Sequence, residues 1–109
     1  MTRDELLYKL RGLETRLLDP DVDAWVDQQS PDDRKKFVAL SLDLHLAITK
    51  LTTAQLSDIA DRLDHLSADL KTGIASLQGH LDNLAKTVKV IDTLSTVVGY
   101  AARIVGLAM

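Results

Sequence analysis

Residues 56–98 read LSDIADRLDHLSADLKTGIASLQGHLDNLAKTVKVIDTLSTVV, with an apolar side chain at every third or fourth position. These positions are Leu56, Ile59, Leu63, Leu66, Leu70, Ile74, Leu77, Leu81, Leu84, Val88, Ile91, Leu94 and Val98. Steps of three and four follow the period of an α-helix, so the side chains lie along one side of it. The sequence therefore predicts a long amphipathic helix with one continuous apolar stripe.

Two glycines interrupt this stretch without shifting the stripe. Gly73 and Gly79 each cost a helix interior about 1 kcal/mol relative to alanine, yet the apolar spacing stays in phase beyond both. A turn would have no reason to keep that phase, so we expect one helix from about residue 53 to about residue 107. The alternative is a hairpin bent at Gln78-Gly79-His80.

The length of this helix has a consequence for what covers the stripe. At about 1.5 Å per residue, residues 56–98 span about 65 Å, whereas a compact chain of 109 residues has a radius of gyration near 13 Å. The overhanging part of the stripe has to meet a fold-back of the chain, a second copy, another protein or lipid.

Composition favours helices packed on helices and excludes several classes of function. With 46% hydrophobic, 27% charged and 4% aromatic residues, the chain suits a single domain, residues 1–109, with an aliphatic core. The net charge of -3 and the scattered Lys and Arg residues provide no footprint for nucleic acid. The absence of cysteine excludes thiol catalysis and disulfides. The N-terminus lacks the pattern of a signal peptide, so we expect a cytoplasmic protein.

Three helix starts are encoded in the N-terminal half. Thr2 and Glu5 form a capping box, and the helix that follows should end by residue 19, before a proline. Asp19-Pro20 and Ser30-Pro31 each combine an N-cap residue with proline in the first helical position. We expect a short second helix to about residue 29, in which Trp25 anchors the packing.

Residues 37–51, FVALSLDLHLAITKL, fit two patterns. Apolar residues alternate with polar ones, as in a half-buried strand, but no second strand is available to pair with it. As a helix, the segment carries two apolar rows on nearly opposite sides, so we expect a central helix sandwiched between neighbours. One row is Phe37, Leu40, Leu44, Ile48 and Leu51; the other is Val38, Leu42 and Leu46. A turn should follow around residues 49–53, with a weaker capping box at Thr52 and Gln55.

Candidate catalytic and metal sites find little support. Residues 19–30 have the length of a calcium-binding EF-hand loop, but Ala24 replaces its glycine and Ser30 its bidentate glutamate. His45, His65 and His80 are 20 and 15 residues apart, which is not a metal-ligand spacing. No nucleophile elbow, phosphate-binding loop or grouped carboxylates are present. We therefore expect no enzymatic activity, no metal and no cofactor.

The C-terminal segment, residues 93–109, contains Arg103 as its only charged side chain. It has 17 residues, and a membrane-spanning helix needs about 20. Gly99, Ala102 and Gly106 lie along one side and would permit close approach of another helix. The segment fits a buried or oligomer-forming helix end, and membrane attachment is the alternative.

Together these patterns predict an all-α protein in which short helices within residues 2–51 form a cap on one end of a long amphipathic helix, residues 53–107. We expect a non-enzymatic interaction protein, either a homo-oligomer or a subunit of a larger assembly. Its partner interface should be Leu77, Leu81, Leu84, Val88, Ile91, Leu94, Val98 and Ile104. The alternatives are a membrane-associated protein that uses residues 93–109 and a monomeric bundle closed by a bend at Gly79.

Overall fold

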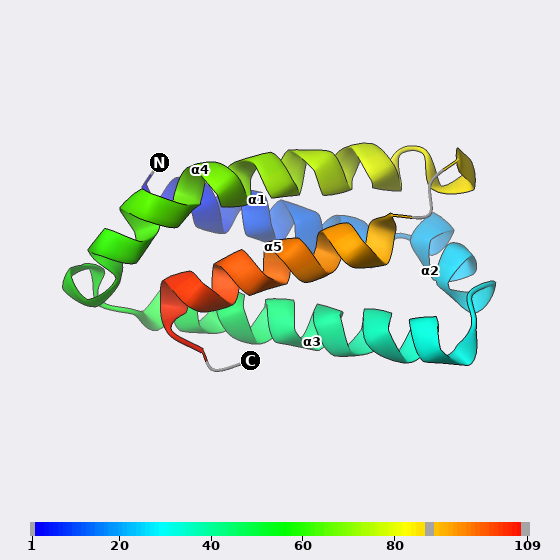
Figure 1. Cartoon of the computed structure of the whole chain (residues 1–109), viewed down its shortest axis with the longest axis horizontal. Coiled ribbons are helices and arrows are strands. Elements are labelled where there is room, and N and C mark those ends of the chain that lie inside the picture. Colours follow the sequence, from blue (N-terminus) through cyan, green and yellow to red (C-terminus); the bar gives the residue numbers. More distant parts are fainter. Residues whose placement is uncertain (1, 87–88, 108–109) are drawn as a thin grey trace.

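The computed structural model describes residues 2–86 and 89–107, and it is helical throughout this part of the chain (Figure 1). The elements are α1 (Arg3–Leu17), α2 (Pro20–Asp27), α3 (Pro31–Thr53), α4 (Leu56–Leu81), the short 3-10 helix η1 (Leu84–Lys86) and α5 (Val90–Val105). The expectation of an all-α protein is confirmed for these residues.

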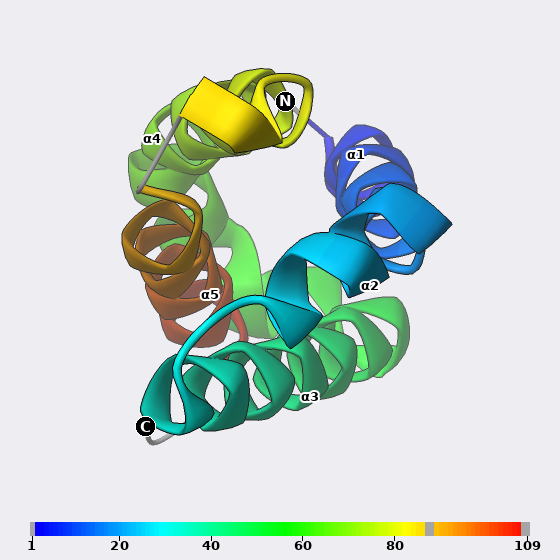
Figure 2. The ribbon, with the colours of Figure 1, turned by 90° about the vertical axis from the view of Figure 1, so that its right-hand side faces the viewer.

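Four of the helices form a closed ring around one apolar core. Viewed along the bundle, α1 neighbours α4, α4 neighbours α5, α5 neighbours α3, and α3 neighbours α1 (Figure 2). The small helix α2 packs across one end, against α3 and α1. The Cα radius of gyration is 13.7 Å, close to the value of about 13 Å expected for a compact chain of this length.

The N-terminal helix starts follow the local chemistry of the sequence. The side-chain oxygen of Thr2 accepts a hydrogen bond from the backbone N–H of Glu5, and that of Ser30 accepts one from Asp33, each at 3.2 Å. Prolines open α2 and α3 as predicted. Because the N-caps satisfy backbone donors that the helix itself leaves unpaired, these boundaries could be predicted locally.

The remaining N-terminal predictions have mixed outcomes. Residues 37–51 are helical, and Trp25 packs edge to face against Phe37 with ring centroids 6.3 Å apart, although its side chain is only half-buried. The capping box predicted at Thr52 and Gln55 is wrong, because Thr52 still lies within α3, which ends at Thr53. The Thr52 hydroxyl instead donates to the carbonyl of Ile48, one turn earlier.

The predicted helix from 53 to 107 is wrong, because the structure divides it into two. Helix α4 ends at Leu81, the chain turns at Asp82 and Asn83, and α5 begins at Val90 and returns along α4 and α3 (Figure 1). Between α4 and α5, the short helix η1 packs Leu84 against the core. An apolar spacing that stays in phase therefore does not require one continuous helix.

Glycine has a different role from the predicted bend. Gly79 lies inside α4, so the chain does not turn there. At Gly73 an added Cβ would lie 3.2 Å from Cγ2 of Val97, which shows how closely α5 approaches α4. Gly106 adopts the left-handed conformation, with φ of 75°, and ends α5.

Arginines bind the C-terminal ends of three helices. The last carbonyl groups of a helix have no partner within it, and a cation is favourable there because of the helix dipole. Each arginine reaches a helix distant in sequence, so these contacts hold the ring together at its corners. The contacts are Arg3 Nη1 to Ala54 O at 2.7 Å, Arg16 Nη2 to Leu81 O at 2.9 Å, and Arg62 Nε to Ile104 O at 2.9 Å.

Candidate interaction surface

The side chains that we expected to face a partner lie mostly inside the chain's own core. Buried there are Leu77, Leu81, Leu94, Val98 and Ile104. Leu84 and Ile91 are half-buried and pack against the same core, and Val88 lies outside the described residues. The fold-back of the chain covers the overhanging part of the apolar stripe, since α5 packs against both α4 and α3.

The apolar C-terminal segment is covered in the same way. Helix α5 buries Val97, Ala101 and Ala102 along with its larger side chains, in contact with α3 and α4. Gly99 has open space at its Cβ position, so it makes no close helix contact. In the part of the chain that is described, no helix combines the length and the apolar character needed to cross a membrane.

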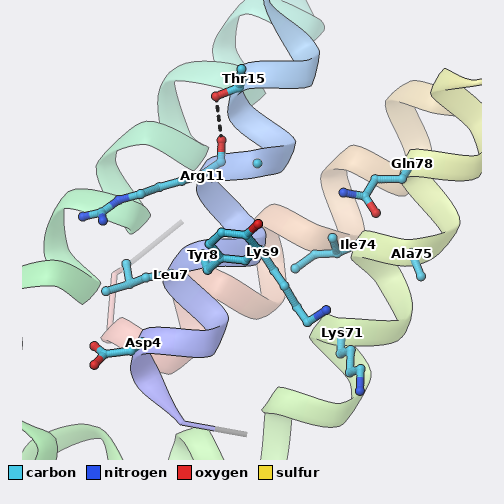
Figure 3. A pocket seen from close by; sticks show the side chains of 11 residues that line it. Asp4, Leu7, Tyr8, Lys9, Arg11, Thr15, Lys71, Ile74, Ala75 and Gln78 are labelled. Atoms are coloured by element: carbon cyan, nitrogen blue, oxygen red, sulfur yellow. Dashed lines mark hydrogen bonds between the residues drawn. The ribbon is translucent and has the colours of Figure 1, made fainter.

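An open groove between α1 and α4 has a volume of about 730 Å³ (Figure 3). Leu7 and Ile74 contribute apolar side chains, and Tyr8, Lys9 and Lys71 surround them. Tyr8 and Lys71 are exposed to solvent, Lys9 is half-buried, and no histidine lines the groove. A groove of this kind contains no buried acid or base that could be activated for catalysis.

A second hollow, of about 460 Å³, lies beside α3 and is more apolar. Its lining includes Leu17, Leu18, Phe37, Val38 and Leu42, from the C-terminal end of α1 and the first half of α3. Leu18 is 74% exposed. It directly follows Leu17, the last residue of α1, and forms the C-cap of that helix.

The outer side of α3 carries the row of apolar side chains that the sequence placed against a second neighbour. Val38, Leu42 and Leu46 are 55%, 61% and 57% exposed, whereas the opposite side of α3 is covered. The expectation that α3 is sandwiched is therefore wrong within this chain, because its neighbours in the ring all lie on one side. We call the set Leu18, Val38, Leu42 and Leu46 the α3 face.

Comparisons with protein families, with curated proteins and with solved structures find no match.

Polar contacts border the α3 face on the side of α1. Nδ1 of His45 lies 3.1 Å from a carboxylate oxygen of Glu14, which ties α3 to α1. The hydroxyl oxygen of Ser41 is buried at the edge of the second hollow and has no hydrogen-bond partner among the described residues. This border therefore contains one buried polar atom that the fold leaves unsatisfied.

Histidine does not assemble a metal centre in the described ranges. Nδ1 of His65 lies 2.7 Å from the backbone carbonyl oxygen of Asp61, one turn earlier in α4. Among residues 2–86 and 89–107, no three His, Asp or Glu side chains gather closely enough to hold an ion.

Proposed function

We propose that this chain is a non-enzymatic helical protein that self-associates through the α3 face. The observation that carries the proposal is the row formed by Val38, Leu42 and Leu46, each more than half exposed on one side of one helix. Single exposed apolar residues are common on protein surfaces, but a contiguous set of them is typical of an interaction site. Leu18 extends this set across the second hollow, which it shares with Val38 and Leu42.

A second copy of the chain matches the row in shape. Val38 lies four residues before Leu42 and Leu46 lies four residues after it, so two copies related by a two-fold axis near Leu42 cover each other's row. Helix α3 has 23 residues and is about 34 Å long, which gives the contact sufficient length. The α3 face is therefore able to pair with itself.

The expected association is weak. Burying the exposed half of each side chain contributes about 1 kcal/mol, so the eight side chains of two α3 faces contribute about 8 kcal/mol. Association costs at least about 4 kcal/mol in lost freedom, which leaves at most about 4 kcal/mol and a dissociation constant near 1 mM. Further favourable contacts around the row would tighten this value.

The other surfaces have less support. The stripe from Leu77 to Ile104 would have to leave the chain's own core before it could meet a partner. Membrane attachment through residues 93–109 would likewise require α5 to separate from α3 and α4. The α3 face needs no such rearrangement, because it is exposed in the folded chain.

Sedimentation equilibrium between about 0.1 mM and about 3 mM tests the proposal, since this range brackets a dissociation constant near 1 mM. The wild-type average mass should rise with concentration from 12.0 kDa toward twice that value. Leu42→Asp should remain at the monomer mass with unchanged helical circular dichroism. Tyr8→Asp is the matched control, because Tyr8 is an exposed aromatic residue on the groove between α1 and α4. A monomeric wild type, or association that survives in Leu42→Asp, would refute the proposal.

A further inference from the structure

Two opposite charges lie on the same side of α3, at equal distances from the middle of the α3 face. Asp32 and Lys50 are 50 − 32 = 18 residues apart, which is five turns at 3.6 residues per turn, so they share one flank of the helix. Their midpoint is residue 41, next to Leu42. Both residues are exposed, and neither side chain has an ion pair or a hydrogen bond to another described residue.

We infer that the second copy packs with its α3 antiparallel to the first, and that Asp32 and Lys50 set this orientation. The inference rests on the proposed self-association through the α3 face. With the two-fold axis at Leu42, Lys50 of the second copy lies eight residues from the axis and Asp32 of the first lies ten. The offset of two residues is about 3 Å along the helix, which a lysine side chain spans easily.

The two-fold axis makes the ion pair occur twice. Lys50 of each copy meets Asp32 of the other, on the flank of α3 that faces away from the second hollow. In the same arrangement Leu46 of one copy covers Val38 of the other. The apolar row thus supplies attraction while the two charge pairs at its ends fix direction and register, as flanking charges do in paired helices.

A parallel arrangement would not form these pairs. Its two-fold axis would run along the helices and put the charged flanks of the two copies on opposite sides of the contact, so Lys50 would meet no Asp32 of the second copy. The charge pattern of α3 therefore distinguishes between the two directions, whereas the apolar row, being symmetric about Leu42, does not.

Charge reversal tests the inference by sedimentation equilibrium. Asp32→Lys and Lys50→Asp should each weaken self-association by on the order of tenfold, because two attractive pairs become two repulsive ones. The double variant Asp32→Lys/Lys50→Asp should restore the wild-type constant. An equimolar mixture of the two single variants should also associate at wild-type strength, as each copy then supplies the charge that the other needs.

Net charge offers an independent control. Asp32→Lys changes the net charge from -3 to -3 + 2 = -1, and Lys50→Asp changes it to -3 − 2 = -5. A general effect of net charge would therefore act in opposite directions in the two variants, whereas the ion pair predicts weakening in both. Lys71→Asp on α4 is the matched surface variant and should associate like the wild type.

The outcomes separate the two levels of the proposal. Suppose that Leu42→Asp abolishes association but the double variant Asp32→Lys/Lys50→Asp does not restore the wild-type dissociation constant. The antiparallel ion pair is then wrong, and self-association through the α3 face stands. If the wild type stays monomeric up to about 3 mM, above the expected dissociation constant of about 1 mM, both are wrong. Association of both single variants at wild-type strength also overturns the inference.

Discussion

Arg16 joins three elements of the fold, and its removal should loosen the corner at which the long apolar stripe is broken. Its guanidinium binds both carboxylate oxygens of Asp21 in α2, at 2.8 and 3.0 Å, and donates to the carbonyl of Leu81 at the end of α4. The hydrogen bonds from Arg16 lower the pKa of the Asp21 carboxyl, and those to Asp21 raise the pKa of Arg16.

The size of the effect follows from exposure. Because the Asp21 side chain is 57% exposed, solvent screens its ion pair, which contributes only a small part of the effect. The charged hydrogen bond to the Leu81 carbonyl adds about 1.5 kcal/mol. Arg16→Met keeps much of the apolar stem and should therefore lower the free energy of unfolding by about 2 kcal/mol. For a chain of this length, that corresponds to a melting temperature about 8 °C lower.

The dependence on pH has a definite sign. Because the pKa of Asp21 is lowered in the folded chain, its stabilisation is present above the ordinary value of 3.8 and is lost as the pH falls through the lowered one. The difference in unfolding free energy between wild type and Arg16→Met should therefore shrink between about pH 5 and about pH 2.

Urea unfolding followed by circular dichroism at several pH values measures this difference. Arg11→Met is the matched control on the same helix, because Arg11 is exposed and its side chain bonds only a threonine hydroxyl, that of Thr52. It should change stability by less than about 0.5 kcal/mol. An Arg16→Met variant as stable as the wild type at pH 7 would refute the role assigned to the corner, as would a difference that does not change with pH.

Three further substitutions test local features of the fold by thermal unfolding. Gly79→Ala should raise the unfolding free energy by up to about 1 kcal/mol, because residue 79 lies within α4 and an added Cβ would meet nothing within 4 Å. An unchanged unfolding free energy would contradict a helix through this residue. Gly106→Ala should lower it by about 1 kcal/mol, because its φ of 75° disfavours a side chain, and an unchanged melting temperature would contradict that conformation. Ser41→Ala should be neutral or stabilising by up to about 1 kcal/mol, because the buried hydroxyl has no partner among the described residues, and a clear loss of stability would show that it has one.

Helix starts could be predicted from the sequence because their causes are local. The hydroxyl groups of Thr2 and Ser30 bond backbone groups three residues ahead, and proline in the first helical position fixes its own backbone angle. Such signals need no knowledge of the rest of the chain. The all-α class and the first three helices followed from them.

The break after Leu81 has causes that lie far away in the sequence. No proline or glycine occurs between residues 82 and 89, and Arg16, which binds the Leu81 carbonyl, is 65 residues earlier. Helix α5 returns because its apolar side chains then become buried between α4 and α3. A stripe of constant phase reports which side chains are buried, but it does not say whether one helix or two bury them.

The α3 face was visible in the sequence as a second apolar row, yet its exposure was not. Both rows of residues 37–51 could be assigned to opposite sides of a helix. Which row is covered depends on how the other helices are arranged, and here the ring leaves Val38, Leu42 and Leu46 outside. The candidate surface thus emerged only when the fold showed which apolar residues remained without a neighbour.

The fold-back of α5 covers the long apolar stripe and leaves the α3 face exposed. The chain has no cysteine, so spin labels can be placed at Asp61→Cys and Arg103→Cys, two exposed positions next to the contact between Arg62 and Ile104. The distance between the labels can then be measured by electron spin resonance. We predict a single short distance, since Arg62 Nε and Ile104 O are 2.9 Å apart. A distance near 63 Å, as in one continuous helix of about 1.5 Å per residue over 42 residues, would contradict the account.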